Sequence, residues 1–439
     1  MTPCVAVFDI GKTNKKFILF DESYNIVKEI QINFEEVKDD EGENCEDLRA
    51  LTEWMLHTWK EIQGDESFDI IALNFTTYGA SFVHLDEDNK PVGALYNYLK
   101  PFPLDLEERF FNAYGPRLDF ATITASPNLG MLNSGLQIYW LKYKHPHTFA
   151  RVKTSLHFPQ YCSFLFTGRK TAEFTSIGCH TAMWNMVANS YHEWLSKEEI
   201  GKLLPPISTD YHNGTASYKG KDIPVGTGLH DSSAALIPYL SKIKDKFILL
   251  STGTWCITLN PFAENNLTKD ELEKDCLNYM TFEGRKVKAS RLFLGNDHEN
   301  FTKRFSGHFY KDKDYFKTVR LDRSLLQNID TLPLIIQDKY NSTSIFAPAD
   351  IDIFVSYEQA YHKLIWDMVQ MQVISVKLAS ENSNTHKVLY VDGGFSKNDI
   401  FMTLLAESLP GIKVEAFELS QGTALGGALV MNAFQSAKV

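Results

Sequence analysis

The sequence predicts an α/β protein built from two related lobes, and two observations support this prediction. A strand–turn–strand unit occurs twice, as VAVFDIGKTNKKFILFD at residues 5–21 and as KFILLSTGTWCITLN at residues 246–260. Strand and helix patterns also alternate in each half of the chain, as parallel sheets with crossover helices require. Small polar turns expose backbone N–H groups, so two such turns indicate two lobes that face one polyphosphate, as in a nucleotide-dependent phosphotransferase.

The length of 439 residues exceeds that of one ordinary domain, and we expect an N-terminal lobe at 1–241 and a C-terminal lobe at 242–439. The boundary is expected near KIKDK at 242–246, which leads into the second strand–turn–strand unit. The formal net charge of -11 argues against a general nucleic-acid binder, which needs a basic face. ATP can still bind, because local N–H groups and a metal neutralise its phosphates.

The six cysteines are scattered without zinc or redox spacing, which is typical of free thiols in a reducing cytosol. The N-terminus enters a strand without a signal-type apolar core, and no apolar run is long enough to span a bilayer. We therefore expect a cytoplasmic protein with a small-molecule substrate, no nucleic-acid or membrane partner, and a monomeric or homodimeric state.

In the first half, the opening hairpin leads into an acidic stretch at 35–47, which is interpreted as a solvated loop and a helix start. A helix that ends at Gly64 is predicted next, because apolar residues recur at helical spacing. These residues are Leu48, Leu51, Met55, Trp59 and Ile62. DIIALNFTTYG at 69–79 then predicts a buried strand.

In the second half, two capping boxes predict helix starts. Ser356 with Gln359 opens a long helix, and Ser396 with Asp399 opens a helix that continues to Leu409. Between and after these starts, the patterns predict a polar loop at 380–387, a strand at 388–394, a strand at 413–419 and a closing helix at 422–434.

The first candidate phosphate site is DIGKTNKK at residues 9–16. Gly11 allows a close backbone approach, Thr13 and Asn14 supply short polar groups, and Lys12 or Lys15 could meet phosphate charge. Asp9 ends an apolar strand, where a carboxylate beside phosphates usually holds Mg²⁺. The alternative is an ordinary hairpin turn.

STGTW at 251–255 is the second candidate phosphate site, with Thr252, Gly253 and Thr254 in the turn. A polar hairpin without a ligand is the alternative. VGTGLHDSSAALIPY at 225–239 precedes it and places Asp231 where a strand passes into a helix. Asp231 is either a helix N-cap or the general base of a phosphoryl transfer, and these two roles are compatible.

VDGGFSKN at 391–398 follows a strand and opens a helix. Gly393 and Gly394 leave room for adenine or ribose against the backbone, and the helix N-terminus favours anions. The glycine spacing differs from that of a Rossmann fingerprint, and the chain has no P-loop or protein-kinase signature.

Taken in this order, the motifs resemble those of the FGGY family of carbohydrate kinases, in the superfamily of actin, hexokinase and heat-shock-chaperone ATPases. DIGKTNKK and STGTW resemble the family's two phosphate motifs, and LHDSSAA resembles its catalytic aspartate segment. VDGGFSKNDIFMTLLAE and QGTALGGA resemble the adenosine motif and the closing helix. STGTW and the His230–Asp231 pair are similar to the rhamnulokinase-like branch, with fuculokinases and xylulokinases as relatives.

The resemblance covers nearly the whole chain and implies two actin-like (ribonuclease H-like) lobes, each with a mixed sheet, and an interlobe active-site cleft. It implies ATP and Mg²⁺ as cofactors, Asp231 as the base that deprotonates the sugar hydroxyl, and Asp9 as the residue that organises Mg²⁺. It further implies phosphate contacts at Gly11, Lys12, Thr13, Asn14, Lys15, Thr252, Gly253 and Thr254, and adenosine contacts at Gly393, Gly394 and Asn398.

The candidate sugar-binding residues lie in segments that depart from the family pattern. They are Thr77, Tyr78, Gly79, Gln160 and His230. Tyr78 and Ala80 replace typical residues, and Gln160 stands where an aspartate is common. NYLKP at 97–101 replaces the Trp/Asp/Arg cluster that the family often has.

The expected activity is ATP-dependent phosphorylation of a hydroxyl of a free ketose that is rhamnulose-, fuculose- or xylulose-like. The alternatives are a kinase for another small polyol, a non-catalytic sugar sensor, and an actin-like filament or chaperone ATPase. Asp231 and the two phosphate turns argue against the sensor, because a sensor has no need of a base.

Overall fold

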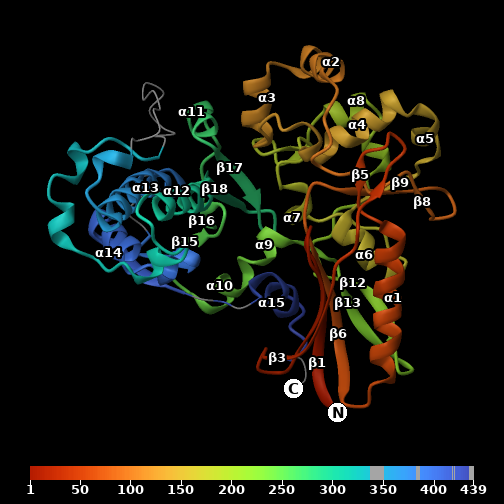
Figure 1. Ribbon diagram of the computed structural model, residues 1–439. Coiled ribbons are helices and arrows are strands. Elements are labelled where there is room, and N and C mark those ends of the chain that lie inside the picture. Colours follow the sequence, from red (N-terminus) through yellow and green to blue (C-terminus); the bar gives the residue numbers. More distant parts are fainter. Residues whose placement is uncertain (337–350, 382–385, 418, 420, 435–439) are drawn as a thin grey trace. The chain divides into compact units, whose positions relative to one another are not determined.

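The computed structural model describes residues 1–336, 351–381, 386–417, 419 and 421–434, and the chain forms two compact units (Figure 1). The first unit comprises Met1–Lys244, Asn278–Arg285 and Gln421–Val439, and the second comprises Asp245–Leu277 and Lys286–Ser420. The main division at 244/245 falls within the KIKDK segment. From the sequence we expected a single boundary at 241/242. The structure instead assigns two later segments, Asn278–Arg285 and Gln421–Val439, to the first unit.

The sheet of the first unit begins with the predicted hairpin, β1 (Thr2–Ile10) and β2 (Lys15–Phe20), which continues antiparallel into β3 (Ile26–Ile32). On its other side β1 pairs in parallel with β6 (Phe68–Thr77), and β6 pairs in parallel with β13 (Lys221–Gly226) and β14 (Leu229–His230). β12 (His212–Tyr218) pairs antiparallel with β13 at the edge. The register places Asp9 of β1 beside Thr76 of β6.

The sheet of the second unit repeats this topology. β15 (Phe247–Thr252) pairs antiparallel with β16 (Cys256–Asn260), which pairs antiparallel with β18 (Lys286–Leu292). β15 also pairs in parallel with β19 (Val388–Gly393), and β19 pairs in parallel with β20 (Lys413–Ala416). The prediction of two α/β lobes with a mixed sheet in each is therefore confirmed.

Helices cover both faces of the first sheet. α1 (Leu48–Gly64) begins after its N-cap Asp47 and buries the predicted apolar stripe, except that Leu48 is only half-buried (Figure 1). Its Trp54 lies edge-on to Phe8, with ring centroids 5.4 Å apart. Val7 points the other way, and a Cβ added to Gly427 of α15 (Gly422–Leu429) would lie 3.3 Å from it. Glycine thus lets the closing helix lie directly on the sheet.

The second unit has its core between its sheet and α12 (Leu294–His308), α13 (Tyr357–Ala379) and α14 (Asp399–Ser408). Ser356 caps α13 as predicted, but the Gln359 side chain accepts from Val355 rather than from the Ser356 N–H. The capping box predicted for Ser396 and Asp399 is wrong. A single 3₁₀ turn, Gly394–Lys397, comes first, and Asn398 caps α14 instead.

The other elements are short. The remaining strands are β4 (Val37–Lys38), β5 (Asn44–Cys45), β7 (Phe82–Leu85), β8 (Pro91–Val92), β9 (Thr154–His157), β10 (Trp184–Asn185), β11 (Ser190–Tyr191) and β17 (Cys276–Met280). The remaining α-helices are α2 (Leu104–Tyr114), α3 (Arg117–Thr124), α4 (Ser134–Lys144), α5 (Pro146–Arg151), α6 (Phe158–Thr167), α7 (Phe174–Ile177), α8 (Trp194–Lys197), α9 (Asp231–Ala234), α10 (Ile237–Lys242) and α11 (Lys269–Glu273). Within the described ranges, no helix is both long and apolar enough to cross a membrane.

Two buried histidines on the small β8-β7-β9 sheet make the stability of the chain depend on pH. Burial lowers the pKa of His84 to about 4, and burial with a nearby His230 lowers the pKa of His157 to about 3. In an unfolded chain both would titrate at about pH 6.5, so acid protonates the unfolded state first and favours it. Between about pH 7.5 and about pH 5, the free energy of unfolding should fall by about 2 kcal/mol for each of these histidines.

Urea denaturation at these two pH values checks this prediction. The fall in the free energy of unfolding between the two pH values should be smaller by about 2 kcal/mol in His84→Phe than in the unaltered chain. His57→Gln is the matched control, because the side chain of His57 is 68% exposed on α1. The same decline in all three proteins would contradict the prediction.

Candidate active site

Asp231 occupies the first position of α9, directly after β14. Its Oδ1 accepts hydrogen bonds from the Ser232 N–H at 2.6 Å and the Ser232 hydroxyl at 3.2 Å, and it lies 3.2 Å from Nε2 of His230. No hydrogen bond from any described residue reaches Oδ2. The side chain is 33% exposed, so a ligand can reach the carboxylate.

His230 lies behind Asp231 and is buried. Burial lowers the pKa of His230, partly opposed by Asp231, which favours a neutral ring. Its Nε2 also lies 3.3 Å from Sγ of Cys179. A Cβ added to Gly79 would lie 2.6 Å from this ring, so only glycine allows the contact. The His230 ring is thus next to both Gly79 and Asp231.

Asp9 is the second carboxylate of this region. Its Oδ1 accepts a 2.7 Å hydrogen bond from the Thr76 hydroxyl. Burial first, and then the charge of Asp231, raise the pKa of Asp9 to about 6, although Thr76 and Lys16 oppose this shift. Two carboxylates that repel each other suit a divalent cation. Among the described residues, no three His, Cys, Asp or Glu side chains group as a metal site.

In the turn between β1 and β2, the Gly11 N–H donates to the Asn14 carbonyl at 2.9 Å. The close approach of a phosphate to the Gly11 backbone stays a prediction. Thr13 and Asn14 are exposed at its tip. Lys15 differs from the expectation of a phosphate contact: it is 1% exposed, and its Nζ lies 2.7 Å from Glu46. An amine buried in an ion pair cannot reach a phosphate. Lys12 is also paired, with Glu36 at 2.8 Å.

Three candidate sugar-binding residues point into the protein. The Thr77 hydroxyl donates to the Tyr78 carbonyl, and the Tyr78 hydroxyl donates to Glu46 at 3.3 Å. Gln160 is fully buried, and its amide donates to the Gly228 carbonyl at 3.0 Å. These contacts correct the expectation for Thr77 and Gln160, whose polar groups support the backbone around Asp231 instead of facing a ligand.

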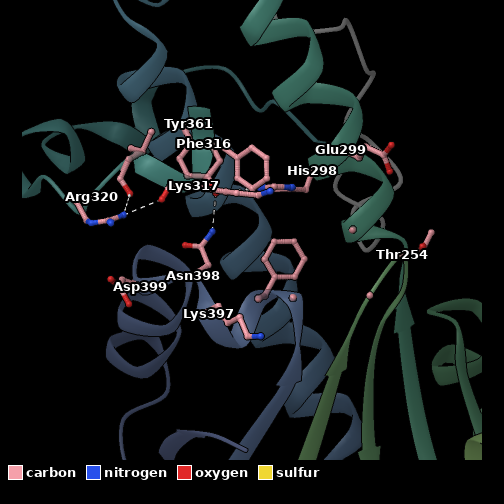
Figure 2. Close-up of a pocket in the computed structure, with 15 residues that line it drawn as sticks. Thr254, His298, Glu299, Phe316, Lys317, Arg320, Tyr361, Lys397, Asn398 and Asp399 are labelled. Carbon is pink, nitrogen blue, oxygen red and sulfur yellow. Dashed lines mark hydrogen bonds between the residues drawn. The ribbon is translucent and has the colours of Figure 1, made fainter. Parts of the chain in front are cut away.

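The second unit contains a cavity of about 560 Å³ (Figure 2). It lies beside the β15–β16 turn and the start of α14. Four predicted nucleotide-binding residues line it: Gly253, Thr254, Gly394 and Asn398. The other lining residues are Gly295, His298, Glu299, Phe316, Lys317, Val319, Arg320, Tyr361, Phe395, Lys397 and Asp399.

Thr252 and Gly393 directly precede the lining residues Gly253 and Gly394. The buried Thr252 hydroxyl donates to the Asp392 carbonyl at 2.6 Å and accepts from the Phe395 N–H at 3.0 Å. A Cβ added to Gly393 would lie 1.8 Å from the Thr252 carbonyl oxygen. These residues therefore join the two turns, and the expected ligand contact of the Thr252 hydroxyl is corrected to a structural bond.

Asn398 faces the cavity but is also the N-cap of α14. Its Oδ1 accepts from the Phe401 N–H at 3.0 Å. Its Nδ2 donates to the Tyr361 hydroxyl at 2.7 Å, as Figure 2 shows. A ligand would meet an amide that is already held in place. The side chain therefore shapes the cavity floor more than it offers free hydrogen bonds.

Comparison with known families decides what kind of protein carries these sites. The N-terminal domain of the FGGY family of carbohydrate kinases matches residues 4–238, and the C-terminal domain of carbohydrate kinase FGGY matches residues 244–438. The chain belongs to the FGGY family of carbohydrate kinases. The resemblance expected from the motifs is thereby confirmed.

Among FGGY relatives, the rhamnulokinase of Halalkalibacterium halodurans is 26% identical over 267 residues, which cover 57% of this chain and 54% of that protein. The chain thus spans about half the length of this relative. The L-fuculokinase of Haemophilus influenzae is 19% identical, over 96% of this chain and 93% of the relative. A carbohydrate kinase structure from Novosphingobium aromaticivorans superposes with a TM-score of 0.80 at 21% identity, covering 98% of this chain and 91% of that one. The glycerol kinase of Plasmodium falciparum with ADP superposes with a TM-score of 0.76 at 16% identity, covering 99% and 90%. These two structures share the fold of this chain.

Several residues that line the cavity of this FGGY chain lie outside the motifs recognised in the sequence, so they were not predicted. Phe316, Lys317 and Arg320 belong to or follow a short 3₁₀ turn without a motif. Gly295 could have been found, because it stands at the start of a helix after a strand. A Cβ there would lie 1.8 Å from the Gly253 carbonyl oxygen. Nε2 of His298, which belongs to α12, lies 3.1 Å from the Tyr361 hydroxyl.

Proposed function

We propose that the chain is an ATP-dependent kinase that phosphorylates a hydroxyl of a free ketose of the rhamnulose, fuculose or xylulose type. The arrangement at Asp231 carries this proposal. Donors engage Oδ1, while Oδ2 is open to a ligand in a side chain that is 33% exposed. A carboxylate held at one oxygen and open at the other is suited to accept a proton from a substrate hydroxyl.

The nucleotide would bind on the second unit. The cavity of about 560 Å³ lies within the usual size of small-molecule sites, and Phe316 and Tyr361 give it aromatic walls. Adenosine in this cavity would place its phosphates toward the turn at Gly253 and Thr254. Backbone N–H groups in such a turn can bind phosphate oxygens.

Asp9 would hold Mg²⁺, directly or through water, beside the turn at Gly11, Thr13 and Asn14. Its carboxylate is fixed by Thr76 and lies within the electrostatic influence of Asp231. When bound, Mg²⁺ would neutralise charge on the transferred phosphoryl group. The protein's own part is to orient the carboxylate.

In the transfer step, the hydroxyl proton moves to Oδ2 of Asp231, and the hydroxyl oxygen forms a bond to the γ-phosphorus. The bond from the γ-phosphorus to the bridging oxygen breaks, and its electron pair leaves with ADP. Asp231 later returns the proton to water. Because little covalent help is needed, positioning and charge are the main contributions of the protein.

The names of the relatives support a ketose as acceptor. Rhamnulokinase and L-fuculokinase are the names of the matched relatives, and a xylulose kinase from Rhodospirillum rubrum shares the fold. A small polyol is the alternative, because the glycerol kinase of Plasmodium falciparum also shares it. A cytoplasmic location would fit the six cysteines, whose side chains are all buried and form no disulfide among the described residues.

An ADP-release assay with Mg-ATP and a panel of ketoses and small polyols tests the proposal. At least one ketose should accelerate ADP release by about a hundredfold or more over the sugar-free rate, because the base acts on a bound hydroxyl. ATP turnover that is equally fast without any sugar would instead indicate a filament-like or chaperone-like ATPase. Sugar binding without turnover would indicate a sensor.

A further inference from the structure

Lys12 and Glu36 form an ion pair above the first turn, and both remain accessible. Lys12 Nζ lies 2.8 Å from Glu36 Oε1, and the two side chains are 25% and 37% exposed. Glu36 belongs to the acidic stretch at 35–47. That stretch is held down by Lys100, whose Nζ lies 2.5 Å from Asp39 and 2.8 Å from Glu41, and by the Lys15–Glu46 pair. The stretch therefore presents Glu36 in a defined place.

Aromatic rings and an amide surround this pair. Lys12 Nζ lies 5.9 Å from the ring centroids of both Tyr78 and Tyr98. The Asn97 amide nitrogen lies 3.4 Å from Glu36 Oε1. The group thus combines a cation, a carboxylate, an amide and two ring faces. Asn97 and Tyr98 belong to NYLKP at 97–101, the segment that departs from the family pattern.

The group lies in the same region as Asp231. Tyr78 is next to Gly79, which contacts the His230 ring, and the Tyr78 and Tyr98 rings are 6.0 Å apart. Burial raises the pKa of Tyr98, Lys12 opposes this, and the charges of Asp231 and Glu36 add to it. The charges of the ion pair and of the candidate base therefore both act on the hydroxyl of Tyr98.

The chemistry of the pair suits a neutral polyol better than a phosphate. A carboxylate 2.8 Å from the amine cancels its charge and repels an anion. An ammonium that donates beside a carboxylate that accepts can engage two adjacent hydroxyls, each in a charge-assisted hydrogen bond. The ring of Tyr98 can cover the apolar C–H face of the same sugar.

We propose that Lys12 and Glu36 are specificity-determining residues that bind two adjacent hydroxyls of the acceptor sugar, instead of the phosphates of ATP. This inference rests on the proposed kinase function and names its substrate as a molecule with a vicinal diol. It assigns Lys12, which the first phosphate motif associates with ATP, to the sugar.

Lys12→Met, Glu36→Gln and the double variant test this assignment in the full chain, with the best ketose of the panel. Each single change should raise KM for the sugar about tenfold or more, with KM for ATP within about twofold. The double variant should raise KM for the sugar by less than the product of the two single-variant factors, because the residues act as a pair. Removing one of the two hydroxyls from the sugar should have a similar effect on the unaltered chain.

Lys197→Met and Glu193→Gln are the matched controls, since these residues form an exposed 2.7 Å pair on the first unit. They should leave both KM values unchanged. A rise in KM for ATP in Lys12→Met, or no change in either KM, would overturn the inference.

Calorimetric titration of the panel sugars separates this inference from the proposed function, because binding needs no turnover. If the unaltered chain binds a sugar and Lys12→Met does not, the result supports the assignment of the Lys12–Glu36 pair to the sugar. This holds even if no sugar accelerates ADP release. Binding that persists in both single variants overturns it. The absence of any ketose or polyol binding would overturn both proposals.

Discussion

Asp231→Asn should lower the sugar-dependent rate of ADP release by about a thousandfold, the usual contribution of a positioned general base. Asparagine keeps the shape of the side chain and its contact with the Ser232 N–H, but it cannot take up the hydroxyl proton. The loss should therefore fall on kcat, while KM for the sugar and the affinity for ADP stay within a few-fold. Steady-state kinetics and calorimetric titration with ADP measure the two parts separately.

Asp105→Asn is the matched control, because Asp105 also lies in the first turn of a helix, α2, and is paired with Lys144 at 2.8 Å on the surface. It should leave kcat within about twofold, since exposed ion pairs contribute little. If Asp231→Asn retains a tenth of the kcat of the unaltered chain, Asp231 is not the base.

The repeated hairpins could be predicted from the sequence because their signal is local. An apolar strand, a small polar turn and a second apolar strand are complete within each of β1–β2 and β15–β16. The same holds for α1, whose apolar stripe is a property of one helix. The pairing of β1 with β6 and of β15 with β19 then follows from the α/β alternation.

The directions of individual side chains could not be predicted in the same way. Lys15 is buried because Glu46 approaches it from a segment about thirty residues later, which no local pattern reveals. The Thr252 hydroxyl is used by Asp392, far along the chain. The position of Asp231 at the start of a helix could be predicted, because it depends on its own short helix and on its immediate neighbours, His230 and Ser232.

The cavity shows the same limit. Its glycines and its Asn398 stand in recognisable motifs, whereas Phe316 and Arg320 come from a segment that is placed by tertiary contacts alone. The Asp322 N–H, just beyond that segment, donates to His362 of α13 at 2.9 Å. Such an anchor depends on the folded helix and leaves no periodic pattern in the sequence.

Gly393→Ala should have the second largest effect, because Gly393 joins the two turns that border the cavity. Its φ of 90° and ψ of -153° are accessible to glycine almost alone, and an added Cβ would lie 1.8 Å from the Thr252 carbonyl oxygen. The turn at Gly253 and the turn at Gly394 would have to separate. We expect the free energy of unfolding to fall by about 3 kcal/mol and ADP affinity to fall by about a hundredfold.

Gly394→Ala provides the comparison, since it changes the next residue in the same turn. A Cβ at Gly394 meets no protein atom within 4 Å, so this variant should unfold like the unaltered chain. Gly394 lines the cavity, so its added methyl group measures the room for ADP without moving the turns, and the loss of ADP affinity should be smaller than in Gly393→Ala. Urea denaturation and calorimetric titration with ADP, on both variants, measure the two effects. If Gly393→Ala bound ADP as tightly as Gly394→Ala, the two turns would not act as one wall of the nucleotide site, because the change that must separate them would leave the ligand unaffected.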